Sequence, residues 1–535
     1  MSNTFDYIIV GAGSAGCVLA ARLSEDPGVS VLLLEAGPPD HYGLIKMPVG
    51  FSKLMNDRSY NWCLEAEPEP NCADRSIPIP RGKTLGGSSS INGMIYVRGQ
   101  PLDYNTWSQL GNLGWSYERI LPYFMKSEKF ERGEAEDRGQ DGPLSVSDPR
   151  QQHPITNAWV EAGVNAGFPR NADYNNGEQE GFGFYQFTQR NGQRWSTARA
   201  YLDPARKRKN LRVETNALTD KLILDGTRAI GVEVSQNGIP QTFYAGKEVI
   251  LAAGAVHSPV ILERSGIGQA ELLKSHGVEV VHELKGVGEN YRDHYGPRMN
   301  YRVNQKITLN ERTRGLGLVQ SIAQYFLLNQ GDLTLGAGLG HGFVKTRAEL
   351  EGPDVQYHFL HASYATAADR RLDEEPGMTI ATCPLRPESQ GSIHLRSTDL
   401  RDDPVIRPNF LAAKEDQDST VEGLKIARRI SKTAPLADFV SHELTPGADV
   451  ETDDEWLAFA RETGQTFYHV CGTAKMGPDT DPMAVLDDRL RVHGMQGLRV
   501  IDASMMPTLV SGNTNGAVIM IAEKGADMIK EDAKV

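Results

Sequence analysis

The beginning of the chain restricts its fold more than any other feature. An apolar run at residues 7–10 leads directly into the sequence GAGSAG at 11–16, and an apolar stretch follows at 17–23. A second apolar run at 31–34 ends in Glu35. This order of strand, glycine turn, helix, strand and acid predicts a βαβ unit that binds a dinucleotide.

The residue types at this turn suit a pyrophosphate. Gly11 allows the tight turn, Gly13 lets the backbone approach the phosphates, and Gly16 lets helix and strand pack closely. The helix N-terminus presents free N–H groups and the positive end of its dipole. Glu35 lies nineteen residues after Gly16, where an acid accepts hydrogen bonds from an adenosine ribose. An acid there suits FAD or NAD and disfavours a 2′-phosphate.

Length and charge limit the remaining classes of protein. At 535 residues the chain is too long for one hydrophobic core, so two or three domains are expected. A net charge of −13 gives no means of neutralising phosphates and argues against a nucleic-acid partner. It also gives no general attraction to an anionic membrane, although a local patch remains compatible with one.

The cysteines indicate a reducing compartment. There are five, at Cys17, Cys63, Cys72, Cys383 and Cys471, and none forms a CxxC pair. This pattern favours free thiols and no structural metal. The N-terminus does not resemble a signal peptide, and no apolar run approaches eighteen residues. The expected location is the cytoplasm.

Later segments extend the first sheet and indicate a second one. Apolar runs at 247–254 and 498–502 are typical of buried parallel strands. Residues 355–360 and 392–395 alternate or carry aromatic side chains, as strands of a separate antiparallel sheet do. The polar stretch 126–150 is expected to be a surface excursion rather than core. The dinucleotide domain is therefore predicted to be discontinuous.

Two further glycine-containing blocks accompany the first one. In residues 81–93, Gly86 and Gly87 precede three serines, so the loop offers N–H and O–H donors that can wrap a pyrophosphate or approach a flat ring. Residues 254–268 are predicted to form a strand end, a turn and a short helix. His257 in this block is interpreted as a structural residue on the turn.

Together these blocks resemble the glucose–methanol–choline (GMC) oxidoreductase family of FAD-dependent alcohol oxidisers. The resemblance covers essentially the whole chain and implies FAD as the dinucleotide. Within the family, the segments at 183–186 and 191–196 are typical of bacterial alcohol dehydrogenases for aliphatic alcohols and polyethylene glycols, and next of choline dehydrogenases. The motifs that carry the resemblance are GAGSAG (11–16), GKTLGGSSSIN (82–92), GAVHSPVILERSGIG (254–268), GVGEN (286–290) and IDASMMP (501–507).

The resemblance implies an α/β fold (α+β overall), with a Rossmann-like FAD-binding domain of GMC type and an inserted antiparallel-sheet substrate domain. The FAD-binding domain is expected to comprise residues 1–155, 195–300 and 460–535. The substrate-binding domain is expected to comprise residues 156–194 and 301–459.

The resemblance also places the catalytic pair. The catalytic histidine of the family corresponds to His469, and its second position, a His or an Asn, corresponds to Asn513. Elementary chemistry agrees, because alcohol oxidation needs a base for the hydroxyl proton and histidine is the natural base near neutral pH. An amide can hold the hydroxyl without competing for the proton. Without the resemblance, a buried structural histidine would be an equal interpretation of His469.

The FAD contacts are carried over in the same way. The first turn and Glu35 should bind the pyrophosphate and the ribose, the second loop the pyrophosphate and the isoalloxazine edge, Leu218 the adenine, and the C-terminal residues the ribityl and flavin end. The predicted set is Gly11, Gly13, Ser14, Ala15, Gly16, Glu35, Ala36, Arg81, Gly86, Gly87, Ser89, Asn92, Gly93, Leu218, Asp502, Ala503 and Asn515.

One departure concerns the attachment of FAD. Some relatives bind FAD covalently through a histidine in the second loop, and that position is Ile91 here. Isoleucine cannot form this bond, so the predicted FAD is non-covalent. No metal site is predicted.

The predicted reaction is oxidation of a primary alcohol to the aldehyde, with His469 as base and hydride transfer to flavin N5. The electron acceptor is expected to be a quinone or another carrier, and a quinone would require peripheral contact with the inner membrane. The alternatives are an alcohol oxidase that uses O₂, a choline dehydrogenase, a flavoprotein lyase of the same fold and a non-catalytic FAD-binding protein.

Choline would need an aromatic or acidic cage for its quaternary ammonium. Five aromatic residues are candidates for that cage or for an apolar channel that holds a chain alcohol, and the channel is favoured. They are Phe467, Tyr468, Phe182, Phe184 and Tyr185.

Overall fold

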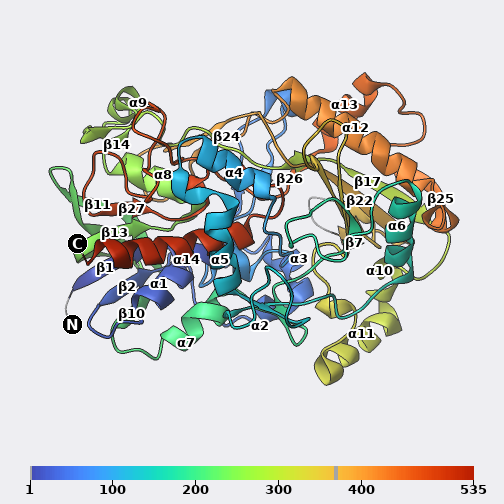
Figure 1. The fold of residues 1–535 in the computed structure, drawn as a ribbon, viewed down its shortest axis with the longest axis horizontal. Helices are drawn as coiled ribbons and strands as arrows, with labels where there is room; N and C mark the ends of the chain where they lie inside the picture. The colour runs from blue at the N-terminus through green and yellow to red at the C-terminus, as the bar shows by residue number, and fades with distance from the viewer. Residues whose placement is uncertain (1–2, 367–370, 535) are drawn as a thin grey trace.

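Two β-sheets organise the molecule. The computed structural model describes residues 3–366 and 371–534. The first sheet lies beside both chain termini, and the second lies towards the opposite end of the molecule (Figure 1). This arrangement agrees with the predicted α/β class and with an additional antiparallel sheet.

The first sheet has seven strands in the order β10-β2-β1-β13-β12-β11, with β27 paired to β13. The strands β10, β2, β1, β13 and β27 are parallel, whereas β12 pairs antiparallel with both β13 and β11. The strands are β1 (Thr4–Val10), β2 (Val31–Leu34), β10 (Leu211–Glu214), β11 (Ala217–Asp225), β12 (Arg228–Gln236), β13 (Ile239–Leu251) and β27 (Leu498–Val500).

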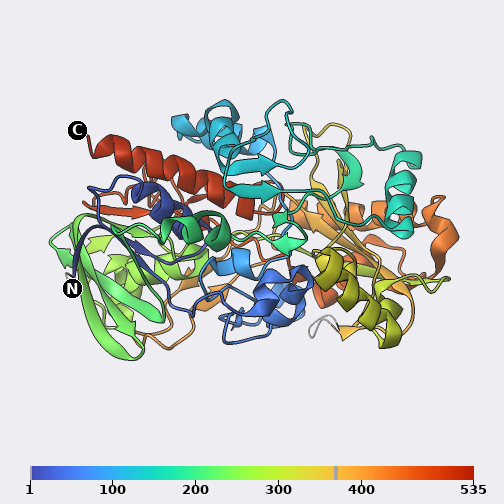
Figure 2. The ribbon, with the colours of Figure 1, turned by 90° about the horizontal axis from the view of Figure 1, so that it is seen from below.

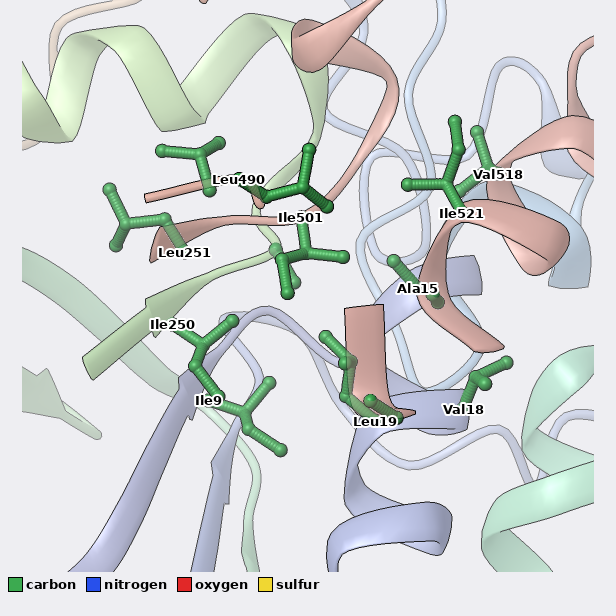
Figure 3. Packing of buried hydrophobic residues seen from close by; sticks show 14 of the residues in the cluster. Ile9, Ala15, Val18, Leu19, Ile250, Leu251, Leu490, Ile501, Val518 and Ile521 are labelled. Atoms are coloured by element: carbon green, nitrogen blue, oxygen red, sulfur yellow. The ribbon is translucent and has the colours of Figure 1, made fainter. Parts of the chain in front are cut away.

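The first and last helices of the chain share the core of this sheet. Every residue of β2 is buried, which is typical of a parallel strand covered on both faces. Helix α1 (Ser14–Leu23) packs against α14 (Asn515–Asp532). Figure 3 shows Val18 of α1, Ile521 of α14 and Ile9 of β1 within this core. Packing of apolar side chains therefore fixes both helices relative to the sheet.

The second sheet has six antiparallel strands in the order β25-β17-β22-β19-β18-β7. Helices α6 (Pro154–Asn165) and α12 (Lys414–Ser431) pack against it, and α13 (Asp453–Thr463) packs against α12. The strands are β7 (Gly181–Phe184), β17 (Arg298–Val303), β18 (Gly340–Val344), β19 (Val355–Leu360), β22 (Gly377–Pro384) and β25 (Val440–Thr445).

The sequence located all four later strand segments. The parallel pairing of β13 with β27 confirms the strands expected near 247–254 and 498–502. Strand β19 coincides with the expected 355–360 and belongs to the second sheet. Strand β23 (Ser392–His394) confirms an antiparallel strand at 392–395, but it pairs with β24 (Val405–Arg407) in a small sheet of its own and does not join the sheet of β19.

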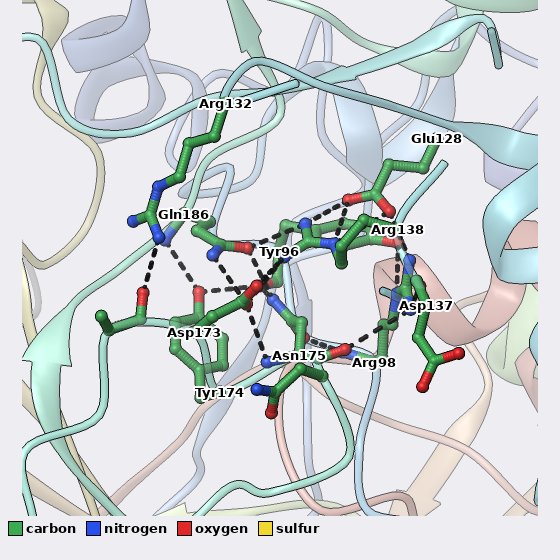
Figure 4. A network of polar contacts seen from close by, with 12 residues as sticks. Tyr96, Arg98, Glu128, Arg132, Asp137, Arg138, Asp173, Tyr174, Asn175 and Gln186 are labelled. Atoms are coloured by element: carbon green, nitrogen blue, oxygen red, sulfur yellow. Dashed lines mark hydrogen bonds and ion pairs between the residues drawn. The ribbon is translucent and has the colours of Figure 1, made fainter. Parts of the chain in front are cut away.

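The expectation of a surface excursion at 126–150 is wrong in part. Glu128 in this stretch forms ion pairs with Arg98 and Arg138, and all three side chains are fully buried (Figure 4). Arg138 also reaches Asp173 at 2.7 Å. Charged side chains are almost never fully buried unless they are paired, and here each charge has a partner. Composition identified the charges but could not show that they meet one another.

Six further helices in the described part of the chain lie around the two sheets. Among residues 3–366 and 371–534, none of the helices combines the length and the apolar character needed to cross a membrane. These helices are α4 (Pro101–Gln109), α5 (Tyr117–Ser127), α8 (Gly254–Arg264), α9 (Ala270–Ser275), α10 (Leu309–Arg312) and α11 (Gly315–Leu328). Helix α11 lies at the rim of the molecule in both orthogonal views (Figures 1 and 2).

The buried ion cluster gives a test of stability. Replacing Glu128 by Gln keeps the volume but removes the carboxylate that pairs with Arg98 and leaves Arg138 with Asp173 alone, so one buried positive charge is uncompensated. We expect the free energy of unfolding to fall by about 3–5 kcal/mol. The same change at Asp148, whose pairing with Arg132 is partly exposed, should cost under about 1 kcal/mol. Chemical denaturation of both variants measures the free energy of unfolding. Equal losses in the two variants would contradict a larger contribution of the buried cluster to stability.

Candidate active site

One cavity is lined by residues from both sheets. Its walls include the glycine turn after β1, the second glycine loop and the first turn of α8. The start of β11 forms part of one end, and strands β17, β19 and β22 contribute from the second sheet. The segments 467–470 and 513–515 also line it. Most of the predicted dinucleotide residues and the predicted catalytic pair therefore face the same space.

The glycine turn packs closely on the protein and opens to the cavity at one position. A Cβ at Gly11, where φ is +99°, would lie 2.6 Å from the carbonyl oxygen of Ala252. A Cβ at Gly16 would lie 1.8 Å from the carbonyl oxygen of Gly11. A Cβ at Gly13 would approach only Ala252, at 4.0 Å. Gly13 thus leaves a free cradle in the cavity wall, which fits a pyrophosphate.

Glu35 closes the far end of this cradle. Its Oε2 accepts a hydrogen bond from the N–H of Ala12 at 3.0 Å, and its Oε1 accepts one from the N–H of Gly37 at 2.8 Å. Burial raises the pKa of Glu35 to about 7. Each carboxylate oxygen can accept a second hydrogen bond, so the group can still receive the hydroxyls of a ribose.

The second glycine loop lies against the first turn. Gly87 has φ +51°, and a Cβ there would lie 2.7 Å from the Cα of Gly13. Ser89 turns inward, because its Oγ donates to the carbonyl of Gly86 at 2.6 Å. Gly16, Gly86 and Ser89 are absent from the cavity lining, in contrast to the predicted direct contacts. They hold the two backbones together instead.

The C-terminal segment brings two helix N-termini to the cavity. Asp502 accepts from the N–H of Gly254 at 2.8 Å and from Ser258 Oγ at 2.6 Å, and so holds the start of α8. Ser14 Oγ donates to Asn515 Oδ1 at 2.7 Å, which joins the first residues of α1 and α14. Helix N-termini carry partial positive charge and favour phosphate groups.

The other residues of the predicted cofactor set also face this cavity. Arg81 donates to the carbonyl of Tyr468 at 2.5 Å and so joins the second loop to the catalytic segment. Ile91, at the position of covalent attachment in some relatives, lines the cavity as well. The predicted residues in the lining are Gly11, Gly13, Ser14, Ala15, Glu35, Ala36, Arg81, Gly87, Asn92, Gly93, Leu218, Asp502, Ala503 and Asn515.

A chain of hydrogen bonds fixes the ring proton of His469. Burial lowers the pKa of His294 to about 4, so this ring is neutral near pH 7. His294 Nε2 lies 2.9 Å from the carbonyl oxygen of Leu385, which can only accept, so Nε2 carries the hydrogen. His294 Nδ1 is then an acceptor, and His469 Nδ1 donates to it at 2.8 Å.

The second nitrogen of His469 carries the lone pair of the neutral ring and shares it with Asn513. Burial, His294, His358 and Arg81 hold the pKa of His469 well below its usual value, so the ring is neutral. Asn513 Nδ2 donates to His469 Nε2 at 3.0 Å. Because its Nδ1 already carries the hydrogen of the neutral ring, Nε2 is the nitrogen that can take a proton from a ligand.

The amide of Asn513 is oriented from the other side. Gln356 Nε2 donates to Asn513 Oδ1 at 3.3 Å, which leaves the NH₂ group directed at His469. Gln356 belongs to β19, so the second sheet sets the orientation of a residue that precedes α14. A hydroxyl group that replaces the hydrogen bond between Asn513 and His469 would meet one donor, the amide, and one acceptor, His469 Nε2.

Sequence reasoning missed three residues around this pair. Besides His294, Asp293 accepts from the N–H of His469 at 2.7 Å. His358 on β19 lines the cavity, and its Nε2 is buried without a hydrogen-bond partner among the described residues. The acid–histidine pair three residues after the GVGEN motif was a usable signal. His358 was inside a correctly predicted strand that carried no other sign of a site.

His257 differs from its predicted place. It lies in the first turn of α8 rather than on the preceding turn, and it lines the cavity. Its ring packs on Trp62 with centroids 4.3 Å apart. Burial lowers the pKa of His257 to about 3, so the ring is an uncharged part of the wall.

The five aromatic candidates separate into two groups. Phe467 and Tyr468 line the cavity. Phe182 packs against Trp159 in the core of the second sheet, and Phe184 packs against the same core. Tyr185 is buried and donates to a backbone carbonyl at 3.0 Å. The prediction that Phe182, Phe184 and Tyr185 border a substrate is therefore wrong. Their side chains contact residues of the second sheet and its core and do not line the cavity.

Comparison with known proteins agrees with this architecture. Residues 5–296 and 387–522 match two family profiles described as GMC oxidoreductase. The chain is 42% identical to an oxygen-dependent choline dehydrogenase of Brucella ovis over 98% of this chain and 95% of that protein. It is 43% identical to an alcohol dehydrogenase [acceptor] of Pseudomonas putida, with the same coverage.

Solved structures give the same result for the fold. The structure of pyridoxine 4-oxidase from Mesorbium loti matches with a TM-score of 0.89 at 30% identity and covers 98% of this chain and 99% of that one. A formate oxidase of Aspergillus oryzae, studied for FAD modification, matches with a TM-score of 0.92 at 27% identity and covers 99% of each chain.

The open cradle at Gly13 yields a prediction. The backbone there is extended, with φ −77° and ψ −160°, so alanine fits the fold but its methyl group enters the cavity. We expect Gly13→Ala to fold normally and to lose FAD affinity at least about tenfold, because the phosphates can no longer approach the backbone. The ratio of flavin to protein absorbance measures this.

Gly16→Ala is the matched control for this change. Its methyl group would collide with the carbonyl of Gly11, so this variant should lose stability rather than affinity alone. A Gly13→Ala protein with full FAD affinity would rule out the close approach at this turn.

Proposed function

Because the chain belongs to the GMC oxidoreductase family, it is an FAD-dependent oxidoreductase that acts on CH–OH donors, and we propose that its substrate is a primary alcohol. The product is the aldehyde. The observation that carries this proposal is the fixed tautomer of His469: the hydrogen bonds of His294 and Leu385 hold the ring hydrogen on Nδ1, so the lone pair lies on Nε2, beside Asn513. A base with a fixed tautomer beside an amide donor suits the removal of a hydroxyl proton.

The chain's own groups perform the proton step. An alcohol oxygen beside Asn513 accepts the amide hydrogen and gives its proton to His469 Nε2. The Nδ1–H bond to His294 keeps the ring in place while Nε2 becomes protonated. When bound, FAD supplies the acceptor for the hydride that leaves the carbinol carbon. One proton and one hydride are thus removed, and the C–O bond becomes a carbonyl.

The proposed FAD contacts follow the cavity from end to end. Gly13 and Ser14 would hold the pyrophosphate between the N-termini of α1 and α14, and Glu35 would bind the ribose. Asn92 and Gly93 would border the isoalloxazine. The association would be non-covalent, since Ile91 stands where some relatives carry the attaching histidine.

The proposed domain division assigns the first sheet to FAD and the second to the substrate. Strands of the first sheet come from residues before 252 and after 497, whereas those of the second come from 181–184 and 298–445. These origins support an FAD-binding domain of 1–155, 195–300 and 460–535. The intervening residues would form the substrate-binding domain.

The surroundings of Phe467 favour an uncharged alcohol over choline. The guanidinium of Arg298 lies 5.3 Å from the centroid of the Phe467 ring. The ring of His358 stacks on Phe467 at 5.2 Å with an interplanar angle of 23°. This aromatic ring of the cavity lining is therefore already in contact with a cation and an imidazole, which disfavours a quaternary ammonium there. We retain choline as the second candidate substrate because a choline dehydrogenase is 42% identical.

The proposed electron acceptor is a quinone or another carrier rather than O₂. The name of the Pseudomonas putida relative, alcohol dehydrogenase [acceptor], supports this choice. The proposed location is the cytoplasm, at the surface of the inner membrane. All five cysteines are free, which suits a reducing compartment.

Removal of the base is the central test. In His469→Ala, FAD should remain bound while anaerobic flavin reduction by alcohol slows by about 10²–10⁴-fold, because a general base contributes that much. Stopped-flow absorbance measures the rate. Near-normal reduction would exclude His469 as the base.

A second histidine controls for indirect effects. His442→Ala changes an exposed histidine on β25 and should leave the rate unchanged. The same experiment separates the alternative functions, because a lyase or a non-catalytic binder would leave flavin unreduced by any alcohol even in the unchanged protein.

The substrate class has its own test. We expect 1-octanol or a polyethylene glycol to reduce the flavin at least about tenfold more efficiently than choline, because Arg298 and His358 cover Phe467. Anaerobic stopped-flow reduction with the three compounds gives the comparison. More efficient reduction by choline would make the protein a choline dehydrogenase while leaving the role of His469 intact.

A further inference from the structure

Helix α11 buries polar side chains and exposes apolar ones, which is the opposite of an ordinary surface helix. None of its 14 residues is charged. The side that packs on the protein carries Ser321 and Tyr325, and Ser321 Oγ donates to Asp332 Oδ2 at 2.8 Å. The side that faces outward carries large apolar residues. In water, an amphipathic helix places these two kinds of residue the other way round.

The exposed apolar residues are concentrated on this one helix. Of the fourteen large hydrophobic side chains that are exposed in the described chain, seven belong to α11. Leu316 is 88% exposed, Leu327 78% and Phe326 69%. The others are Leu318, Val319, Ile322 and Leu328. A contiguous apolar surface of this kind marks a site of protein or membrane contact.

We propose that α11 inserts lengthwise into the interface of a lipid bilayer. At about 1.5 Å per residue its 14 residues are about 21 Å long, too short for a hydrocarbon core of about 30 Å. A helix with one apolar side that does not span the bilayer can lie in the plane of the interface and bury that side among the acyl chains. The polar side then stays against the protein, as observed.

The geometry favours lipid over a second copy of the chain. At about 100° per residue, six of the seven exposed apolar side chains cover roughly half of the helix circumference, and Leu328 at the last position extends the apolar surface further. Helix α11 also lies at the rim of the molecule rather than in a flat face (Figures 1 and 2). A flat protein surface would cover only part of a protruding helix, whereas acyl chains can surround it.

A basic side chain stands at each end of the helix, and an aromatic one accompanies it at the second end. Arg314 is the N-cap residue of α11 and is exposed. At the other end lies the hairpin of β8 (Gln189–Arg190) and β9 (Gln193–Arg194). Its turn approaches Asn329, since a Cβ at Gly192 would lie 2.5 Å from the carbonyl oxygen of Asn329. This hairpin carries Arg190, whose guanidinium lies 4.9 Å from the ring of Trp195. Arginine and tryptophan suit the headgroup region.

The helix is also connected to the cavity. The chain that follows α11 reaches the cavity wall at Ala337, where a Cβ at Gly93 would lie 2.3 Å from the Ala337 side chain. Insertion of α11 would therefore bring this wall towards the bilayer, from which an apolar alcohol or a quinone can enter. Only this consequence rests on the proposed function, because binding to the bilayer needs no catalysis.

Vesicle flotation of the holoenzyme tests the proposal. The variant L316E/F326E/L327E places three charges on the exposed side of α11, and we expect its partition into phosphatidylcholine vesicles to fall by at least about a hundredfold. The matched control L110E/L113E/I239E adds the same charge at three other exposed apolar residues and should bind as the unchanged protein does. FAD content and flavin reduction by a water-soluble alcohol should stay unchanged in both variants.

A second measurement locates the helix in the bilayer. A tryptophan placed by F326W should be quenched by brominated phosphatidylcholine, and one placed by I239W should not. Vesicles with added phosphatidylglycerol should bind the unchanged protein at least as well, because Arg314 and Arg190 flank the helix. Binding to the anionic vesicles alone would replace apolar insertion by charge attraction and overturn the proposal.

Three other results would also overturn it. The first is failure of the unchanged protein to float with either vesicle. The second is an equal loss of binding in the α11 variant and its control. The third is a dimer in light scattering that only the α11 variant dissociates, without vesicle binding, which would assign α11 to a second copy of the chain. Intact vesicle binding by a protein that does not oxidise alcohols would contradict the proposed function and leave the proposal for α11 standing.

Discussion

The close approach of backbones at the glycine turn is the constraint on which the site depends. Gly16 lies against Gly11, and Gly87 lies against Gly13, at separations that leave no room for a side chain. The hydrogen bond from Ser14 to Asn515 brings the start of α14 to the same point. Three distant segments thus form one wall, and only Gly13 leaves that wall open for a phosphate.

The end of the cavity at His469 depends on a chain of hydrogen bonds that includes the second sheet. The carbonyl of Leu385 sets the tautomer of His294, and His294 in turn sets that of His469. Gln356 of the second sheet orients Asn513 beside it. A carbonyl oxygen has no hydrogen to donate, so this single acceptor determines which nitrogen of His469 carries the hydrogen.

Two regions depart from the usual distribution of charge and apolar surface, each for a local reason. Glu128, Arg98 and Arg138 are buried because each charge meets an opposite one. Helix α11 exposes apolar side chains and directs Ser321 inward, which is the distribution expected next to lipid. Average burial preferences predict neither region, since both depend on what lies next to the residue.

The sequence by itself determined the first βαβ unit and the order of the glycine blocks, because these rest on local spacing and residue type. It pointed to His469 and Asn513 only through the resemblance to the GMC family. Only the tertiary structure decided that Ser89 turns away from the cavity and that Phe182 and Tyr185 contact the second sheet. It also decided that His294 accepts a hydrogen bond from His469. These outcomes depend on contacts between residues far apart in the chain, for which a local pattern carries no signal.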